Sequence, residues 1–329
     1  MLAKCGAVGL NGMLGCLLSG VRRGPLAKCR LHSNAKGAST PARYLTAAAV
    51  AAARHFIWQP CYRAVLVDAA GTFLMPSEPI TDVYLRYARP HGCRLSDNEV
   101  LQRFRRAYNT PWGTSSLRYV GDARPFWQNI VEQSTGCNNP EVSEAIYEYY
   151  SRAEAWYVTP GAVEALQRLK SAGLLLAVVS NFDTRLRPLL RELGVEKLFD
   201  AVIVSAEVHA EKPNPVIFDT AVRTLSAAAV TRGTAAMSGC GSPLAPAAAQ
   251  AAAAQRGGAI ATDFAPLFPE QVVHIGDDRR NDCWGARDAG LTAWHWGYDV
   301  RSWEEVADRV LLGSQVDDYY DDLSYAAQA

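Results

Sequence analysis

Four short segments of the chain carry residue types that serve in phosphoryl transfer, and each lies at or beyond the end of an apolar run. In chain order they are Asp68-Ala69-Ala70-Gly71-Thr72, Ser180-Asn181, Lys212-Pro213 and Gly276-Asp277-Asp278 with Asp282. Transfer of a phosphoryl group needs a nucleophile in line, cations that neutralise its oxygens, and donors that hold it. A single aspartate of this kind is more often a helix N-cap, so the indication rests on the four segments together.

The apolar runs beside these segments predict a parallel sheet. Strands are expected over five stretches: 63–67, 174–179, 201–204, 272–275 and 291–296. An amphipathic helix is expected over 160–172, because Pro160 lies near its start and Gly173 follows its end. Strands buried on both faces and separated by helices predict an α/β fold with a Rossmann-like, doubly wound parallel sheet. Ligands bind beyond the carboxyl ends of the strands in such sheets, and the four segments fall there.

Residues 76–158 contain no obvious parallel strand and four helical patterns: 81–91, 97–108, 124–134 and 139–150. Aromatic residues and leucines recur there at helical spacing, which predicts a small α-helical cap placed to close over the site. Candidate substrate contacts on this cap are Arg118, Asp122, Arg124 and Trp127. A structural Arg–Asp pair and a core tryptophan are the alternative for these residues. His274, Asp183 and Arg185 are expected to be structural.

In order and spacing, the four segments resemble the four motifs of the haloacid dehalogenase (HAD) superfamily. Longer stretches resemble plant and algal members of the haloacid dehalogenase-like hydrolase domain-containing protein 3 group, the rhythmically expressed gene 2 type of subfamily IA. Those stretches include Tyr119-x-Gly121-Asp122-x-Arg124-Pro125-Phe126-Trp127, Val179 to Leu186, and Ser205-Ala206-Glu207-Val208 with Glu211-Lys212-Pro213. The resemblance implies a HAD core over 60–75 and 159–315, with a C1-type helical cap at 76–158.

The resemblance also implies a role for each matching residue, in a hydrolase of the phosphatase type that acts on small phosphorylated metabolites. The nucleophile would be Asp68, which would form an aspartyl-phosphate, and Lys212 would neutralise the charge around it. The expected ligands of Mg²⁺ are Asp68, the main-chain carbonyl of Ala70, and Asp277. The expected phosphate-binding residues are Thr72, Ser180 and Asn181. Asp278 and Asp282 would orient the metal ligands and a water molecule.

Ala70 departs from the pattern of HAD phosphatases, which carry a second aspartate at this place as general acid and base. Such help is typically worth about 10²–10⁴ in rate, so a slow or selective phosphatase is expected. A phosphonatase resembles the chain in having alanine there but needs a cap lysine, and residues 76–158 contain none. A dehalogenase uses no metal and lacks the Gly-Asp-Asp segment, so a dehalogenase-type hydrolase is kept only as the third alternative. A binding protein without turnover stays open as the main alternative.

The overall composition bounds the partners. Lys plus Arg and Asp plus Glu both number 33, giving a formal net charge of zero, which argues against nucleic acid or an anionic membrane as partner. No stretch reaches the ~20 apolar residues that a membrane span needs. Eight cysteines are scattered without a Cys-x-x-Cys motif, so reduced thiols are expected.

Three segments stand apart from the expected domains. Residues 1–57 are basic, and no Asp or Glu occurs before Asp68. This predicts an organellar transit peptide, with the chloroplast as the expected destination and the mitochondrion as the alternative. The Ala-rich, low-complexity stretch 225–262 is expected to be a mobile surface loop, part of it transiently helical. Residues 316–329 are expected to form an acidic tail.

Overall fold

The computed structural model describes residues 62–112, 117–239 and 265–313. The basic leader, the acidic tail and residues 240–262 of the Ala-rich stretch lie outside the described residues. Within the described ranges, no helix is both long enough and apolar enough to cross a bilayer.

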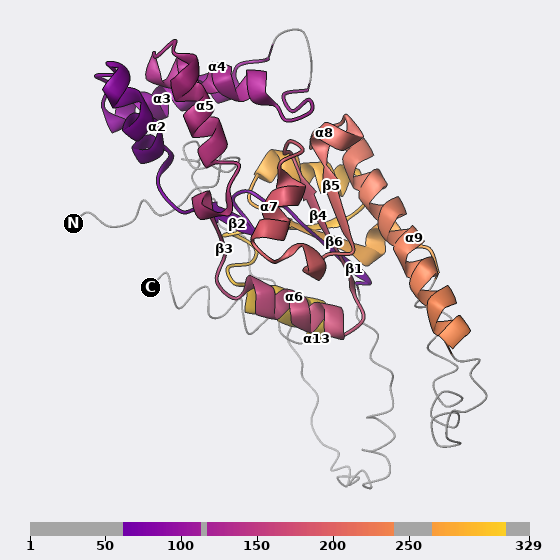
Figure 1. Cartoon of the computed structure of the whole chain (residues 1–329). Helices are drawn as coiled ribbons and strands as arrows, with labels where there is room; N and C mark the ends of the chain where they lie inside the picture. Colours follow the sequence, from indigo (N-terminus) through magenta and orange to yellow (C-terminus); the bar gives the residue numbers. More distant parts are fainter. Residues whose placement is uncertain (1–61, 113–116, 240–264, 314–329) are drawn as a thin grey trace, which may run out of the picture.

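A five-stranded parallel sheet forms the centre of the molecule, and it confirms the predicted fold class. Its strand order is β5-β4-β1-β6-β7, and every neighbouring pair is parallel. The strands are β1 (Ala64–Val67), β4 (Leu175–Ser180), β5 (Ala201–Val204), β6 (Val272–Gly276) and β7 (Thr292–His295). Because β1 lies in the middle, its carboxyl end is flanked by the ends of β4 and β6 (Figure 1).

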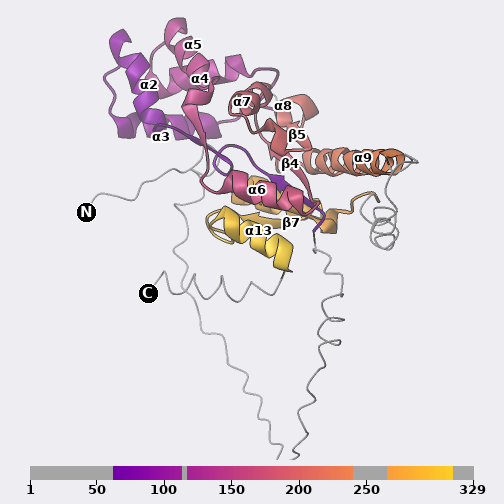
Figure 2. The ribbon, with the colours of Figure 1, turned by 60° about the horizontal axis from the view of Figure 1, so that its bottom comes forward.

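Helices cover both faces of the sheet. On one side α6 (Ala162–Ser171) and α13 (Trp303–Leu312) lie next to each other, as both views show (Figures 1 and 2), together with α7 (Leu186–Glu192). On the other side α9 (Pro215–Gly239) packs on β4 and β5, and α12 (Gly285–Asp288) packs on α9. Successive residues of β1 therefore point into two separate cores, and all four are fully buried. This explains the uninterrupted apolar run in the sequence.

Four helices form the cap between two very short strands. The helices are α2 (Ile80–Ala88), α3 (Asp97–Asn109), α4 (Arg124–Thr135) and α5 (Pro140–Tyr149). They lie together beyond the sheet (Figure 1). The chain leaves the core through β2 (Leu74–Pro76) and returns through β3 (Trp156–Val158), which pair antiparallel. The sequence pattern missed this ribbon because strands of three residues are too short to show an alternating pattern.

The expected surface loop at 225–262 is wrong for its first fifteen residues, 225–239, which continue helix α9. Leu225 and Ala229 are buried in the core on the α9 side of the sheet, and Arg232 forms an ion pair with Asp200. The physical reason is that alanine has the highest helix propensity of all residues. A low-complexity composition therefore extends a helix wherever a few apolar side chains can pack against a neighbouring sheet.

Candidate active site

The strand order brings three of the four sequence segments to one edge of the sheet. Asp68 follows β1, Ser180 is the last residue of β4, and Asp277 follows β6. Lys212 comes from the loop after α8 (Ser205–Val208), the short helix that follows β5. Parallel neighbouring strands end at the same edge, so the four side chains converge although they are far apart in the sequence.

Lys212 is the centre of a buried charge network. Its Nζ donates to Asp68 Oδ1 at 2.6 Å, to Asp282 Oδ1 at 2.5 Å and to the Val179 carbonyl at 2.9 Å. Burial by itself would lower the pKa of Lys212. The carboxylates of Asp282 and Asp68 outweigh this effect of burial, so the pKa of Lys212 is raised. The lysine therefore keeps a full positive charge beside Asp68.

Asp68 has one anchored oxygen and one unpaired oxygen. Its Oδ1 accepts from Lys212 and from Ser180 Oγ at 3.0 Å. Its Oδ2 is buried and has no hydrogen-bond partner among the described residues. Burial raises the pKa of Asp68 to about 7, and the nearby Asp282 adds to this rise, although Lys212 opposes it. An unpaired buried carboxylate oxygen is costly, so this atom is left for a ligand.

Asp277 lies against the turn that follows Asp68. Thr72 Oγ1 donates to Asp277 Oδ1 at 3.4 Å, and a Cβ on Gly71 would collide with the Asp277 carboxylate. Gly71 also has φ +99°, in the left-handed region, so both the conformation and the space require glycine. Burial first, and then the charge of Asp68, hold the pKa of Asp277 well above its usual range.

The arrangement fits a divalent cation bound by oxygen ligands. Carboxylate oxygens of Asp68, Asp277 and Asp282 all lie within 4.8 Å of one another. Asp282 is already engaged, because its Oδ1 binds Lys212 and His274 and its Oδ2 accepts from the Asp278 main chain. Asp68 and Asp277 are therefore the available carboxylates. Among the described residues no hydrogen bond reaches the Ala70 carbonyl oxygen, so it is available as a third ligand of a hard cation.

Other predicted site residues hold the network in place. The side chain of Asn181 accepts from the Lys212 main-chain N–H at 2.6 Å and donates to its carbonyl at 2.9 Å. Its amide is thus occupied in positioning Lys212. The carboxylate of Asp278 accepts the main-chain N–H groups of Arg280 and Asn281 and so caps the π-helical turn Arg279–Trp284. Among the described residues, the Asp278 carboxylate forms no hydrogen bond with Asp68, Asp277 or Asp282.

His274 has the structural role that the sequence analysis expects, and it supports the acid cluster through Asp282. Its Nε2 lies 2.9 Å from Asp282 Oδ1, and its side chain is fully buried. Burial lowers the pKa of His274 below its ordinary value although Asp282 opposes this, so the neutral ring donates a hydrogen bond to Asp282. The signal in the sequence was a single histidine within the otherwise apolar run 272–275.

The four cap candidates all have partners within the protein. Arg118 Nε donates to Glu211 Oε2 at 3.0 Å, beside Lys212, and its guanidinium lies 4.9 Å from the Tyr108 ring. Trp127 Nε1 donates to Asp183 Oδ2 at 3.0 Å. These two contacts join cap and core. Sequence reasoning missed the role of Glu211 because its partner Arg118 lies 93 residues away in the chain.

The remaining pair of candidates stays within the cap. Arg124 Nε donates to Asp122 Oδ2 at 3.3 Å, and Arg124 also forms ion pairs with Glu144 and Glu148. Its guanidinium lies 4.1 Å from the Tyr147 ring. This geometry is that of the structural alternative, an Arg–Asp pair that fixes the start of α4.

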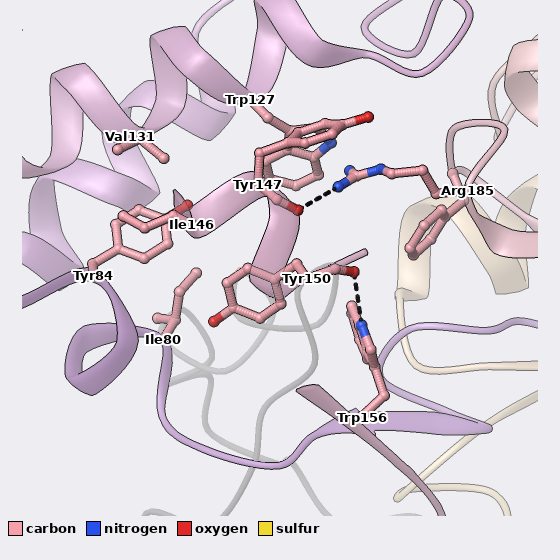
Figure 3. Close-up of a pocket in the computed structure, with 10 residues that line it drawn as sticks. Ile80, Tyr84, Trp127, Val131, Ile146, Tyr147, Tyr150, Trp156 and Arg185 are labelled. Carbon is pink, nitrogen blue, oxygen red and sulfur yellow. Dashed lines mark hydrogen bonds between the residues drawn. The ribbon is translucent and has the colours of Figure 1, made fainter. Parts of the chain in front are cut away.

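A small aromatic cavity of about 30 Å³ lies between the cap and the residues Phe182 and Arg185, which follow the second sequence segment (Figure 3). Figure 3 shows Arg185 reaching across it toward Tyr147, whose main-chain carbonyl accepts from Arg185 Nη1 at 3.1 Å. Arg185 Nη2 also donates to Asp183 Oδ2 at 2.7 Å. No carboxylate of the Asp68 cluster lines the cavity, so this space is separate from the acid cluster.

The sequence match defines the class of protein. Residues 62–290 match the family described as haloacid dehalogenase-like hydrolase, which is more than half of the chain. The chain belongs to this family of hydrolases, and the family expected from the sequence is confirmed.

Several relatives carry the names expected from the motifs. Haloacid dehalogenase-like hydrolase domain-containing protein 3 of Homo sapiens is 32% identical over 166 residues, which cover 47% of this chain and 66% of that protein. The Xenopus laevis protein of the same name is 28% identical over 239 residues, covering 70% and 82%. Rhythmically expressed gene 2 protein of Drosophila melanogaster is 24% identical over 295 residues, covering 81% and 96%. The match to the human protein thus spans slightly less than two thirds of its length.

A solved structure described as a dehalogenase shares the fold. It superposes with a TM-score of 0.51 at 16% identity, over 76% of this chain and 97% of that chain. At this identity the likeness concerns the fold alone.

Proposed function

We propose that this HAD-like hydrolase is a Mg²⁺-dependent phosphatase of small phosphorylated metabolites, with Asp68 as its nucleophile. The observation that carries the proposal is the state of the Asp68 carboxylate. One oxygen is fixed by Lys212 and Ser180, and the other is buried without a partner among the described residues. A carboxylate that is oriented, desolvated and partly unpaired is prepared to attack an electrophile.

The proposed reaction has two steps that balance in atoms and charge. Asp68 attacks phosphorus, the bond to the leaving oxygen breaks, and an aspartyl-phosphate forms while the alkoxide or phenoxide departs. Water then attacks the same phosphorus, inorganic phosphate leaves, and the Asp68 carboxylate is restored. Lys212 holds positive charge against Asp68 through both steps, and Asn181 and Asp282 fix the position of that charge.

Asp68, Asp277 and the Ala70 carbonyl are the groups that would hold Mg²⁺. The ion, when bound, would neutralise charge on the phosphate oxygens. Without a cation, these acids are crowded together, which is why the pKa of Asp68 and that of Asp277 are both raised by burial and by neighbouring acids.

Ala70 makes the proposed phosphatase selective for good leaving groups. The side chain at residue 70 has no proton to give, and residue 70 is buried, so an alkoxide leaving group must take its proton from water. A phenoxide leaves without this help because it is far less basic. We therefore expect aryl phosphates to be hydrolysed much faster than alkyl phosphates.

The test is release of nitrophenolate from p-nitrophenyl phosphate by the full chain, with Mg²⁺ and with chelator. Turnover should need Mg²⁺ and should be lost in Asp68→Asn. Asp97→Asn is the matched control, because Asp97 lies on the exposed start of α3 and its change should leave turnover intact. Absence of Mg²⁺-dependent turnover in the folded wild-type protein would overturn the proposal.

A binding protein without turnover is the second candidate, and Ala70 is the observation that favours it. Such a protein would bind inorganic phosphate or a phosphorylated metabolite at the same cluster and release no product. Calorimetric binding of a phosphate ester that stays intact over hours, together with no turnover of p-nitrophenyl phosphate, would establish this candidate in place of the phosphatase.

We also propose that the basic leader directs import into the chloroplast, with the mitochondrion as the alternative. The support is compositional, since no acidic residue precedes Asp68. N-terminal sequencing of the mature protein isolated from cells checks this, and a terminus at Met1 would contradict it.

A further inference from the structure

Two cysteines that are far apart in the sequence meet inside the cap. Cys93 lies between α2 and α3, and Cys137 lies between α4 and α5. Cys93 is nearly buried, with 8% of its surface exposed, while Cys137 is partly exposed. The third cysteine among the described residues, Cys283, lies in the core behind the sheet. Neither cap cysteine has a part in the proposed phosphatase chemistry.

Reciprocal hydrogen bonds hold each thiol against a main-chain carbonyl close to the other cysteine. Cys93 Sγ donates to the Thr135 carbonyl at 3.3 Å, two residues before Cys137. Cys137 Sγ donates to the Ala88 carbonyl at 3.7 Å, and this oxygen also accepts the Cys93 main-chain N–H at 3.2 Å. The Cys137 main-chain N–H is fixed in turn by Thr135 Oγ1 at 3.1 Å.

The two thiols are also electrostatic neighbours. Burial is the main cause that raises the pKa of Cys137, and the next is the nearby Cys93 thiol. The pair does not belong to a metal site, because the only group of three or more candidate ligands within the described residues is the Asp68 cluster. Two adjacent thiols without a third ligand have disulfide formation as their characteristic chemistry.

We propose that Cys93 and Cys137 are a modification site that forms a disulfide within the cap when the protein meets a low-molecular-weight disulfide. Cys137, the more exposed, attacks one sulfur of the reagent and releases one equivalent of thiol. Cys93 then attacks the Cys137 sulfur and releases the second thiol. The protein loses two hydrogens, both of which end on the released thiols, and the reagent is reduced by two electrons.

The disulfide would join the end of α2 to the end of α4. A covalent bond would then connect the turn that contains Cys93 to the turn that contains Cys137, which in the reduced protein are connected by weak thiol hydrogen bonds. Because a cross-link restricts the unfolded chain more than the folded one, the melting temperature should rise by about 5 °C or more on oxidation, and a reducing agent should reverse the rise.

The experiment treats the full-length, reduced protein with oxidised glutathione and maps disulfides in unreduced peptides by mass spectrometry. The native protein should give a peptide pair that links Cys93 to Cys137 as its main product. The same treatment in urea should give a mixture among the eight cysteines, because the unfolded chain no longer selects one partner. This comparison needs no variant that could fail to fold.

Two variants sharpen the result. Cys137→Ser should abolish the Cys93 cross-link and the thermal shift, whereas Cys283→Ser should retain both. The proposal would be overturned if the native protein gave the same mixture of disulfides as the protein in urea. It would also be overturned if glutathione stayed attached to Cys137 because Cys93 did not attack the mixed disulfide.

Discussion

In the proposed phosphatase, residue 70 would separate metal binding from proton transfer. Its metal ligand would be the main-chain carbonyl, which alanine supplies as well as any residue. A general acid needs a side chain, which alanine lacks. The neighbouring charges are otherwise complete, since Asp68, Ser180 and Lys212 are joined by hydrogen bonds.

Ala70→Asp should therefore raise kcat/KM for alkyl phosphates, by up to about 10²–10⁴, and should change aryl phosphate hydrolysis much less. Steady-state kinetics on one alkyl and one aryl phosphate measure the two effects. Ala70→Asn is the matched control, because it adds similar volume without a titratable proton. Equal rates for wild type and Ala70→Asp on the alkyl phosphate would show that leaving-group protonation is not what limits this site.

Among the described residues, Lys212 carries the only ammonium that pairs with Asp68 and Asp282, and its removal leaves these buried carboxylates without that counter-charge. Lys212→Met should lower the free energy of unfolding by about 3–5 kcal/mol at pH 8 in the presence of chelator. The loss should be smaller at pH 5, because the unpaired acids then take up protons. Urea denaturation at the two pH values measures this.

Lys170→Met is the control for that experiment. Lys170 is one-third exposed and pairs with Asp200 at 3.6 Å, so its replacement should cost about 1 kcal/mol or less at both pH values. Equal losses for the two variants would mean that the Lys212 network contributes no special stability.

At the scale of elements, helix α9 is where composition and packing disagree. The Ala-rich sequence indicates a loop, but one face of the helix is buried against the sheet through Leu225 and Ala229. Helix propensity and a few buried side chains are sufficient, because most helical stability in proteins comes from packing of one face.

Leu225→Ala should accordingly lower the free energy of unfolding by about 2–5 kcal/mol, since Leu225 is fully buried. Val230→Ala on the same helix is the matched control; Val230 is 45% exposed, and its change should stay within about 0.5 kcal/mol. Chemical denaturation of both variants tests the helix, and a Leu225→Ala protein as stable as wild type would restore the loop interpretation.

At the scale of the whole molecule, the acid cluster couples stability to pH and, in the proposed phosphatase, would couple it to Mg²⁺. The carboxyl of Asp68 has a pKa raised from 3.8 to about 7, so between these values the folded protein keeps a proton that the unfolded chain releases. Through this group, stability falls as pH rises across that window when no metal is present. The pKa of Asp282 is instead lowered, although burial opposes this, because Lys212 and His274 favour its charged form; its contribution is lost only below about pH 4.

Mg²⁺ should reverse the loss at high pH, because the ion competes with the proton on Asp68. The melting temperature should be higher in about 10 mM Mg²⁺ than in chelator, and this rise should be small at pH 5 and larger at pH 8. The chosen concentration is on the order of ten times a millimolar dissociation constant. Calorimetry at matched ionic strength measures the rise, with Asp277→Asn as the variant that should lose the effect. A shift independent of pH would place the metal elsewhere.

The amino-acid sequence by itself determined the order of the strands along the chain, the four segments at their ends and the membership of the HAD-like hydrolase family. These features are local. Short apolar runs alternating with helical patterns are typical of the interior strands of a parallel sheet, and polar residues at their carboxyl ends lie at the ligand edge of such a sheet. The four cap helices were likewise visible from their aromatic residues at helical spacing.

Only the tertiary structure decided how side chains from distant segments share their charges. It showed that Asp282 is occupied by Lys212 and His274, that Asn181 fixes the Lys212 main chain, and that Arg118 pairs with Glu211. It also brought Cys93 beside the turn that holds Cys137. Such pairings depend on distances between atoms that are far apart in the sequence. The pattern of residues specifies which segments form strands and helices, whereas the packing of those elements decides which oxygen of Asp68 remains free.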